Sequence, residues 1–256
     1  MGELRRRSAS VLVAAPAALV LVYLGGWPLA VGVALLGLGG AAEAGRLLAR
    51  RGAALRRGSP VAALVFWAAD VWAAPAALPV LVALAVGGPA LFRRPGILGR
   101  AVGTVWAGGY AAGLLGALLP LRAAGLPYPL LVLTACWGTD VAAYLTGRAF
   151  GRHRLWPRLS PAKSWEGAAG GWLCGGAAVW AVGWGFGLPR EVCLLWATLL
   201  PLVAQAGDLA ESALKRWAQV KDSGSFLPGH GGVLDRLDSV LAVAPVAYLL
   251  LWGWGK

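Results

Sequence analysis

The side chains best suited to chemistry gather in one stretch of the chain, residues 207–239, which combines aspartates, basic side chains, a histidine and a glycine-rich turn. If the first part of this stretch is helical, Asp208, Glu211, Ser212 and Lys215 share one helix face, because they are spaced at i, i+3, i+4 and i+7. Carboxylates bind hard cations, and amines bind phosphate. The combination predicts metal-dependent transfer of a phosphoryl or nucleotidyl group.

The glycine-rich turn reads Pro-Gly-His-Gly-Gly over residues 228–232, shortly before Asp235 and Asp238. Its backbone amides can point inward and bind an anion. A solvated loop is the alternative, but the acids and bases of this stretch alternate with glycines rather than with helix formers. The turn therefore favours a phosphate site beside the two carboxylates.

A second polar block, which contains Asp140, Tyr144, Gly147 and Arg148, ends an apolar run. If the run is helical, Asp140, Tyr144 and Gly147 lie on one face. Tyr144 and Arg148 also suit an interfacial anchor, so either role fits them. Asp140 lies eight residues before the interface, where an acid needs a partner, and this favours a functional role.

A third block, Ser160-Pro161-x-Lys163, precedes another apolar run. Ser160 is expected to cap a helix, and Pro161 to occupy the first helical position. A lysine in the first turn opposes the helix dipole, so Lys163 is better explained by an anion bound at the free amides. The alternative is that Lys163 is one more charge on the cytoplasmic side.

These blocks together resemble the CDP-diglyceride synthetase family, the phosphatidate cytidylyltransferases, which are integral membrane enzymes. The resemblance is carried mainly by residues 212–216, 221–222, 228–232 and 235–238, where more than ten residues of the family pattern recur in order without a gap. The Asp140 and Ser160 blocks are similar to two further family blocks. Such a match is too long to arise by chance.

The resemblance implies that Asp208, Asp235 and Asp238 hold the metal. Three carboxylates from two segments suit Mg²⁺, which takes few carboxylates and completes its shell with phosphate and water. A second metal ion is left open. Lys215 and Arg236 would hold phosphate, and Asp222 would be a further catalytic residue. The expected substrate-binding residues are Asp140, Tyr144, Arg148, Ser160, Lys163, Ser212, Arg216, His230, Gly231 and Gly232.

The reaction that the resemblance implies is CTP plus phosphatidate giving CDP-diacylglycerol and pyrophosphate. A CTP-dependent polyprenol kinase, or a cytidylyltransferase for another isoprenoid phosphate, is the alternative within enzymes. A membrane transporter is the alternative of another class. A transporter would place polar residues through the full depth of several spans, whereas here they gather near one membrane face.

Composition predicts an all-α polytopic membrane protein, because 59% of the 256 residues are hydrophobic and only 13% are charged. The three cysteines lie in apolar runs without metal-ligand spacing, so they are expected to be small buried residues. The sequence predicts about nine spans. Two form a hairpin over 11–42, and the others lie near 60–76, 78–92, 100–120, 128–147, 166–187, 191–214 and 237–254.

Charge predicts that the N-terminus is inside and the C-terminus outside. With that orientation only Arg122, Arg190 and Lys256, of 23 lysines and arginines, lie outside. The net charge of +12 is then explained by cytoplasmic loops beside the inner membrane, and no nucleic-acid partner is expected. The reactive stretch would face the cytoplasm.

Residues 1–125 are expected to form a membrane scaffold of about five helices and residues 126–256 a catalytic region of about four. The scaffold carries no motif with a chemical reading, apart from Asp70, a lone acid in an apolar run. Asp70 is either functional or a neutral residue near an interface. Whether the chain pairs as a homodimer is left open.

Overall fold

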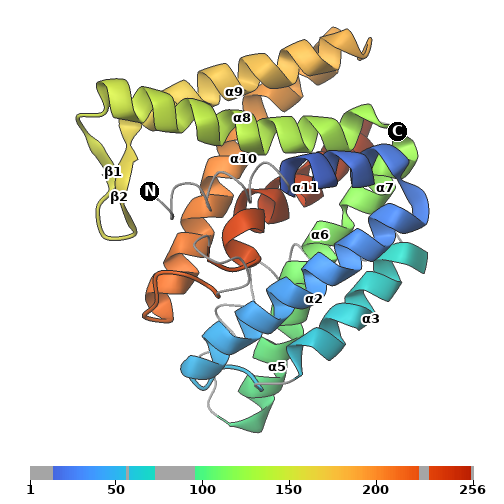
Figure 1. Cartoon of the computed structure of the whole chain (residues 1–256), viewed down its shortest axis with the longest axis vertical. Helices are drawn as coiled ribbons and strands as arrows, with labels where there is room; N and C mark the ends of the chain where they lie inside the picture. The colour runs from blue at the N-terminus through green and yellow to red at the C-terminus, as the bar shows by residue number, and fades with distance from the viewer. Residues whose placement is uncertain (1–13, 56–57, 73–95, 225–230, 255–256) are drawn as a thin grey trace.

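The computed structural model describes residues 14–55, 58–72, 96–224 and 231–254 of the chain (Figure 1). Two sequence predictions lie outside the described residues, namely the span expected at 78–92 and the role of His230. Apart from one short hairpin, every regular element in the described part is helical, which confirms the all-α class.

The first half of the chain begins with a helix over Ala14–Leu24, which Gly25 separates from α2 (Gly26–Arg50) by adopting a φ of 64°. The left-handed backbone at this position favours glycine, so the helix break expected near residue 25 is confirmed. α2 extends beyond the predicted end near residue 42, as far as Arg50. It packs against α3 (Ser59–Trp72).

Three short helical segments and a π-turn complete this half. α5 (Ile97–Gly108) runs through the π-helical turn η1 (Gly109–Gly113) into α6 (Leu114–Gly116), and α7 follows (Leu118–Ala124). α2 packs against both α5 and η1.

The second half contains four long helices and a hairpin. α8 (Pro127–Phe150) leads into the antiparallel strands β1 (Arg154–Trp156) and β2 (Ser160–Ser164), in which Arg154 lies opposite Ser164. α9 (Trp165–Gly185), α10 (Arg190–Trp217) and α11 (Leu234–Trp254) follow. The hairpin, which the sequence did not predict, projects from the adjoining ends of α8 and α9 (Figure 1).

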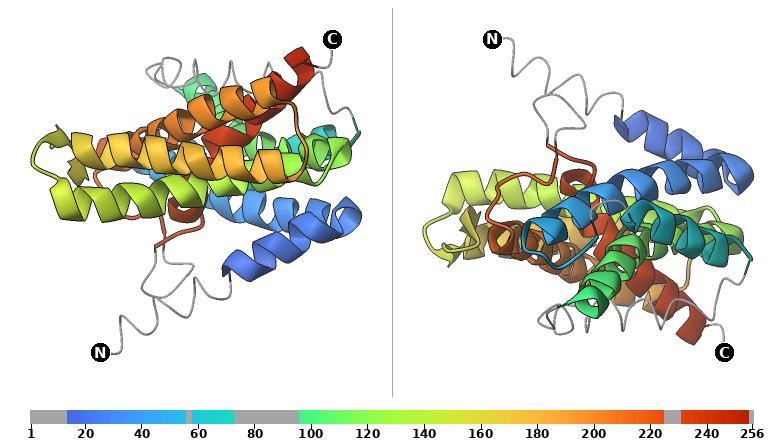
Figure 2. Two further views of the ribbon diagram at one scale, coloured as in Figure 1. Left: turned by 90° about the horizontal axis from the view of Figure 1, so that it is seen from above. Right: turned by 90° about the horizontal axis from the view of Figure 1, so that it is seen from below.

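Small residues bring α8 and α9 into close contact, and Figure 2 shows the two helices lying side by side. A Cβ at Gly171 would lie 2.9 Å from the Cβ of Ala143, so the helices could not approach this closely with a larger residue there. Close approach through small residues is how helices associate in lipid.

α11 connects the two halves, because it packs against α10 and α8 and also against α2, α6 and α7. It approaches α10 closely at Gly207, where an added Cβ would lie 2.6 Å from the Cβ of Ala242 and 2.9 Å from the carbonyl oxygen of Asp238. Gly207 therefore brings Asp208 on α10 and Asp238 on α11 to neighbouring positions.

Within the described residues, four helical stretches are long and apolar enough to cross a bilayer: 26–50, 97–124, 127–150 and 190–217. The helices of this membrane-protein fold have their reactive residues at one end. The count of nine spans and the N-terminus-inside orientation stay predictions.

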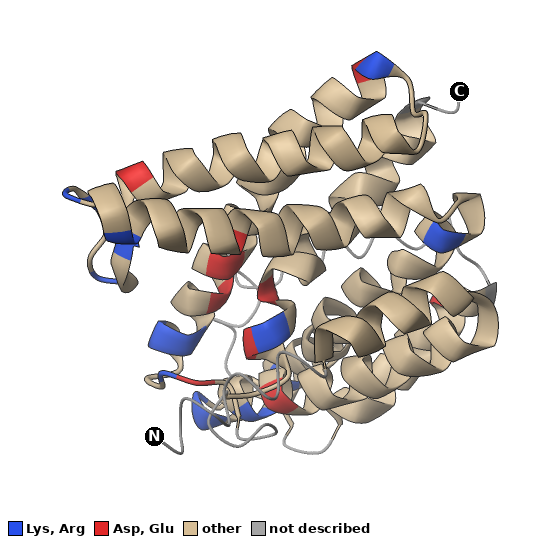
Figure 3. Cartoon of the chain, turned by 45° about the horizontal axis from the view of Figure 1, so that its top comes forward, with Lys and Arg blue, Asp and Glu red and all other residues tan. Residues whose placement is uncertain are grey.

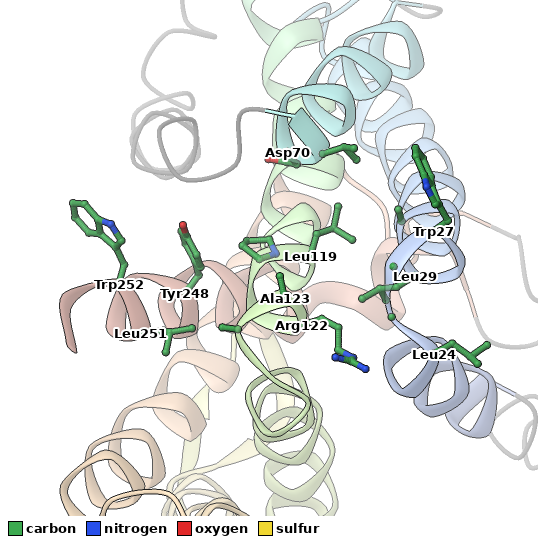
Figure 4. A pocket seen from close by; sticks show the side chains of 16 residues that line it. Leu24, Trp27, Leu29, Asp70, Leu119, Arg122, Ala123, Tyr248, Leu251 and Trp252 are labelled. Carbon is green, nitrogen blue, oxygen red and sulfur yellow. The ribbon is translucent and has the colours of Figure 1, made fainter. Parts of the chain in front are cut away.

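The start of α2, the ends of α3 and α11, and α7 line a cavity of about 980 Å³, shown in Figure 4. Asp70 lines it, together with Trp27, Arg122 and Trp252. Arg122 donates from Nε and Nη2 to the carbonyls of Val22 and Tyr23, at 2.7 and 2.9 Å. It thereby satisfies carbonyls at the end of the first helix, which explains this arginine structurally.

Candidate active site

Charged residues gather around the C-terminal part of α10, the start of α11 and the hairpin, as the coloured ribbon of Figure 3 shows. Two ion pairs organise this region. The first joins the hairpin to α10, and the second joins α10 to α11.

The first ion pair links Lys163 on β2 to Asp208 on α10, with Nζ 2.5 Å from Oδ2. The predicted helix start at Ser160 is wrong, because residues 160–164 are extended and pair with β1. The N-cap is Ser164, whose Oγ accepts a hydrogen bond from the Gly167 amide at 3.1 Å. Lys163 therefore lies just before the helix and not in its first turn.

The second ion pair centres on Lys215, whose Nζ lies 2.6 Å from Asp235 Oδ1 and 3.0 Å from Glu211 Oε2. The prediction that Asp208, Glu211, Ser212 and Lys215 share a helical stretch is confirmed, since α10 continues to Trp217. Ser212 Oγ lies 3.5 Å from Asp208 Oδ1. Glu211 is fully buried, and its Oε1 has no hydrogen-bond partner among the described residues.

Asp235, in the first turn of α11, is surrounded by hydrogen-bond donors. Its Oδ2 accepts from the amides of Ser223 and Gly232, at 2.9 and 2.7 Å, and from the Ser223 hydroxyl at 2.9 Å. Burial alone would raise the pKa of this carboxyl, but hydrogen bonds from Lys215 and from the two amides outweigh it and hold the pKa below its ordinary value. Asp235 is therefore a fixed, ionised carboxylate.

Asp238 and Asp140 lie near the same cluster. The charges of Asp208 and Asp238 act on Asp140, as does the charge of Lys163, so these groups are close in space. Asp238 Oδ1 accepts from the Ser239 amide at 2.6 Å. The side chain of Asp140 is exposed on α8 and not enclosed as the sequence suggested.

Other predicted residues occupy the rim of this region. The Arg148 guanidinium donates to the Tyr144 hydroxyl at 3.2 Å, and both side chains are exposed at the end of α8. The guanidinium of Arg216 donates to the carbonyl of Leu159 at 3.4 Å, which ties α10 to the hairpin.

The structure does not draw every predicted residue into the charged cluster. Ser160 pairs with Trp156 across the hairpin, and Asp222 is exposed. Arg236 is exposed in the first turn of α11, the turn that carries Asp235. Gly231 has a φ of 80°, and the Gly232 amide points at Asp235. In this structure that amide binds a carboxylate, and the phosphate role of the turn stays a prediction.

Sequence reasoning missed three residues that shape the site. Glu166 accepts from His153 Nδ1 at 2.6 Å and from the backbone amides of Arg152 and His153 at 3.2 Å, so it fixes the start of the hairpin. The other two residues are Glu43 and Ser223, whose hydrogen bond links α2 to the segment before α11. A lone acid in an apolar stretch was the available signal for Glu43, the same signal that singled out Asp70.

The chemistry of the donor set is compatible with a hard divalent cation. No three His, Cys, Asp or Glu side chains in the described residues form a ready-made metal centre. Asp208, Asp235 and Asp238 nevertheless supply carboxylate oxygens at neighbouring helix positions, and the Lys163 and Lys215 ammonium groups provide the positive charge beside two of them. Oxygen donors of this kind are the ligands that Mg²⁺ prefers.

The chain belongs to the cytidylyltransferase family, whose model matches residues 5–254. It is similar to phosphatidate cytidylyltransferases from Pseudomonas aeruginosa (45% identity over 129 residues, 48% of each chain) and Bacillus subtilis (45% over 129 residues, 50% of this chain and 48% of the relative). The protein of that name from Brucella suis is 50% identical over 119 residues, 44% of this chain and 42% of the relative. The matched segment thus spans about half the length of these curated relatives.

Proposed function

We propose that this protein is a phosphatidate cytidylyltransferase, which makes CDP-diacylglycerol and pyrophosphate from CTP and phosphatidate. The observation that carries the proposal is the pairing of Lys163 with Asp208 and of Lys215 with Asp235 at one end of membrane-length helices. Carboxylates, which can bind a divalent cation, lie there beside amines, which can bind phosphate. A triphosphate that carries a metal ion requires both kinds of group. Membership of the cytidylyltransferase family supports the same conclusion.

In the proposed reaction, a phosphate oxygen of phosphatidate attacks the α-phosphorus of CTP. The new P–O bond forms as the bond from the α-phosphorus to the oxygen bridging to the β-phosphorus breaks, and pyrophosphate leaves with that bond's electrons. The attacking group is already an anion, so the reaction needs no strong general base. The demand on the protein is to align the two phosphates and to stabilise the charge that spreads over them.

The two lysines suit that demand. Lys163 and Lys215 each have an ammonium group that a carboxylate holds near the site, at 2.5 and 2.6 Å. A triphosphate that enters would compete with these carboxylates for the ammonium groups. Arg236, in the first turn of α11, adds a further cation to the same helix end.

Asp208, Asp235 and Asp238 are the residues that would hold Mg²⁺. The bound ion would supply charge neutralisation on the phosphates and fix their alignment. Asp235 Oδ2 is occupied by amide and hydroxyl donors, so Oδ1, which now accepts from Lys215 Nζ, is the oxygen that a metal ion would contact. The backbone donors hold this carboxylate in place whichever cation contacts it.

The lipid substrate would enter from the side of the helices. Tyr144 and Arg148 are exposed at the end of α8, and Asp140 lies on the same helix one turn before Tyr144. A tyrosine and an arginine at a membrane interface can bind a lipid phosphate while the acyl chains stay in the bilayer. We place this interface on the cytoplasmic side of the inner membrane, because loops rich in lysine and arginine lie on that side.

The test is pyrophosphate release by the purified protein with Mg²⁺, phosphatidate and each of CTP, ATP, GTP and UTP. We expect release with CTP that depends on phosphatidate and on Mg²⁺, and little release with the other nucleotides. A CTP-dependent polyprenol kinase would give CDP and no pyrophosphate. Absence of pyrophosphate release in the presence of CTP and phosphatidate would contradict the proposal.

A further inference from the structure

Glu43 is a buried carboxylate in the half of the chain that carries no recognisable motif. It lies in α2, its side chain is 2% exposed, and residues 180 or more positions later in the chain contact it. A buried carboxylate is costly unless hydrogen bonds satisfy it, so its partners indicate what it is for.

Arg46 Nη2, on the same helix, lies 3.9 Å from Glu43 Oε1, and the other two partners of Glu43 belong to the segments that surround Asp235. Glu43 Oε2 accepts from the Ser223 hydroxyl at 2.8 Å and from the Leu234 amide at 3.0 Å. The Leu234 amide is at the N-terminus of α11, where an amide has no partner within the helix. Leu234 is itself fully buried, so without Glu43 this amide would have neither water nor an acceptor.

Ser223 lies between two carboxylates. Its hydroxyl is 2.8 Å from Glu43 Oε2 and 2.9 Å from Asp235 Oδ2, and its amide donates to Asp235 Oδ2. A hydroxyl has one proton to donate, so Ser223 can serve only one of the two carboxylates at a time. When it donates to Glu43, the amides of Ser223 and Gly232 still hold Asp235.

Two glycines make room for this carboxylate. A Cβ at Gly224 would collide with Glu43 Oε1, and a Cβ at Gly232 would collide with Glu43 Oε2 and with Ser223 Oγ. The two segments that donate to Asp235, at Ser223 and at Gly232, thus both pass directly over the Glu43 side chain. The backbone that carries the Ser223 and Gly232 amides therefore packs against α2 at Glu43.

We propose that Glu43 is a positioning residue for Asp235. It anchors Ser223 and the start of α11 to α2, and so fixes the amides that orient the Asp235 carboxylate. This inference extends the proposed function, and it assigns to the N-terminal half a part in building the site. Glu43 acts through the turn and has no contact of its own with the reacting phosphates.

The test compares Glu43→Met, which keeps the length of the side chain but accepts no hydrogen bond, with Glu43→Gln, whose carbonyl oxygen can still accept from Ser223 and Leu234. We expect Glu43→Met to lower kcat by about 10- to 100-fold and to raise the Mg²⁺ concentration for half-maximal rate, as loss of a supporting contact commonly does. The KM for CTP should change less than kcat. Glu43→Gln should recover most of the rate.

The second readout needs neither metal nor substrate. Amide hydrogen exchange at Ser223, Gly232 and Leu234 should be faster in metal-free Glu43→Met than in the parent, and close to the parent in Glu43→Gln. Ser223→Ala, which removes one of the two contacts, should cause a smaller change of the same kind. Asp70→Asn is the matched control, since Asp70 is the other described buried acid of this half. Asp70 lines the cavity with Arg122, and Glu43 does not.

Unchanged exchange at these amides in Glu43→Met, or a parental rate and Mg²⁺ dependence in that variant, would overturn the inference. An effect of the same size in Asp70→Asn would also overturn it, because any buried acid would then suffice. If the parent protein transfers no cytidylyl group, the proposed function fails, and hydrogen exchange alone decides the role of Glu43.

Discussion

Lys163 and Lys215 each contact a carboxylate that the family pattern assigns to the metal, so the charges of the site are already compensated without a substrate. The two pairs differ in burial. Lys163 and Asp208 are about one quarter exposed, whereas Lys215 is 14% exposed and its partners Asp235 and Glu211 are 9% and 0% exposed. Removing one partner should therefore affect binding in the first pair and folding in the second.

Lys163→Gln tests the first pair. If this ammonium binds the CTP phosphates, loss of one charged contact should cost roughly 1.5–3 kcal/mol, or about one to two decades in kcat/KM for CTP. The dependence of the rate on phosphatidate should change less. Arg158→Gln, which removes an exposed charge from the same hairpin, is the control. Kinetics equal to those of the parent would reduce Lys163 to a loop charge.

Lys215→Met tests the second pair. The variant leaves the buried Glu211 carboxylate without its cation, and we expect a loss of about 3 kcal/mol in the free energy of unfolding. Adding Glu211→Gln removes the unpaired charge, so the double variant should regain most of that stability and still lack activity. Thermal unfolding in detergent measures the first effect. A double variant as unstable as the single one would contradict this account.

At the scale of elements, the sequence predicted the long helices well, because continuous apolar runs of about 20 residues have few alternatives. It did not predict the hairpin, since Ser160-Pro161 is as typical of a helix start as of an edge strand. Lys163 was therefore assigned to the wrong element, since it lies on β2, and its predicted contact with CTP stays a prediction. Glu43 was missed because its partners lie some 180 residues away, and spacing along the chain reveals only local partners.

Gly207→Ala tests the approach of α10 to α11. The added methyl would lie 2.6 Å from the Ala242 Cβ, so the helices must separate, and overpacking of this kind typically costs about 1–3 kcal/mol. We expect lower stability and a fall in activity, since Asp208 and Asp238 would move apart. Gly253→Ala on α11 is the matched control, because nothing lies within 4 Å of its added Cβ. Equal effects of the two substitutions would rule out this role for Gly207.

At the scale of the whole molecule, the reactive residues lie at one end of the helices, and the cavity with Arg122 lies at the other. Arg122 is among the three basic residues expected outside, and the hairpin lysine is among those expected inside. The arrangement agrees with a site at one membrane face. It leaves the identity of that face to experiment.

Cysteine labelling in intact cells tests the orientation. Cys136 and Cys193 are buried as expected, but the expectation is wrong for Cys174, which is exposed and is replaced by alanine for this test. In that chain, Leu55→Cys should react only with reagents that reach the cytoplasm, and Glu191→Cys only with impermeant reagents added outside. Both positions are exposed at opposite ends of the helices. Labelling of both from the same side would exclude the nine-span arrangement.

The most direct test of the central claim follows the phosphates of CTP into the products. The purified protein is given Mg²⁺, phosphatidate and CTP labelled at either the α- or the γ-phosphorus. The account predicts that the α-label enters the lipid and that the γ-label appears only in pyrophosphate. A γ-label in the lipid, or no label in the lipid from either nucleotide, would contradict it.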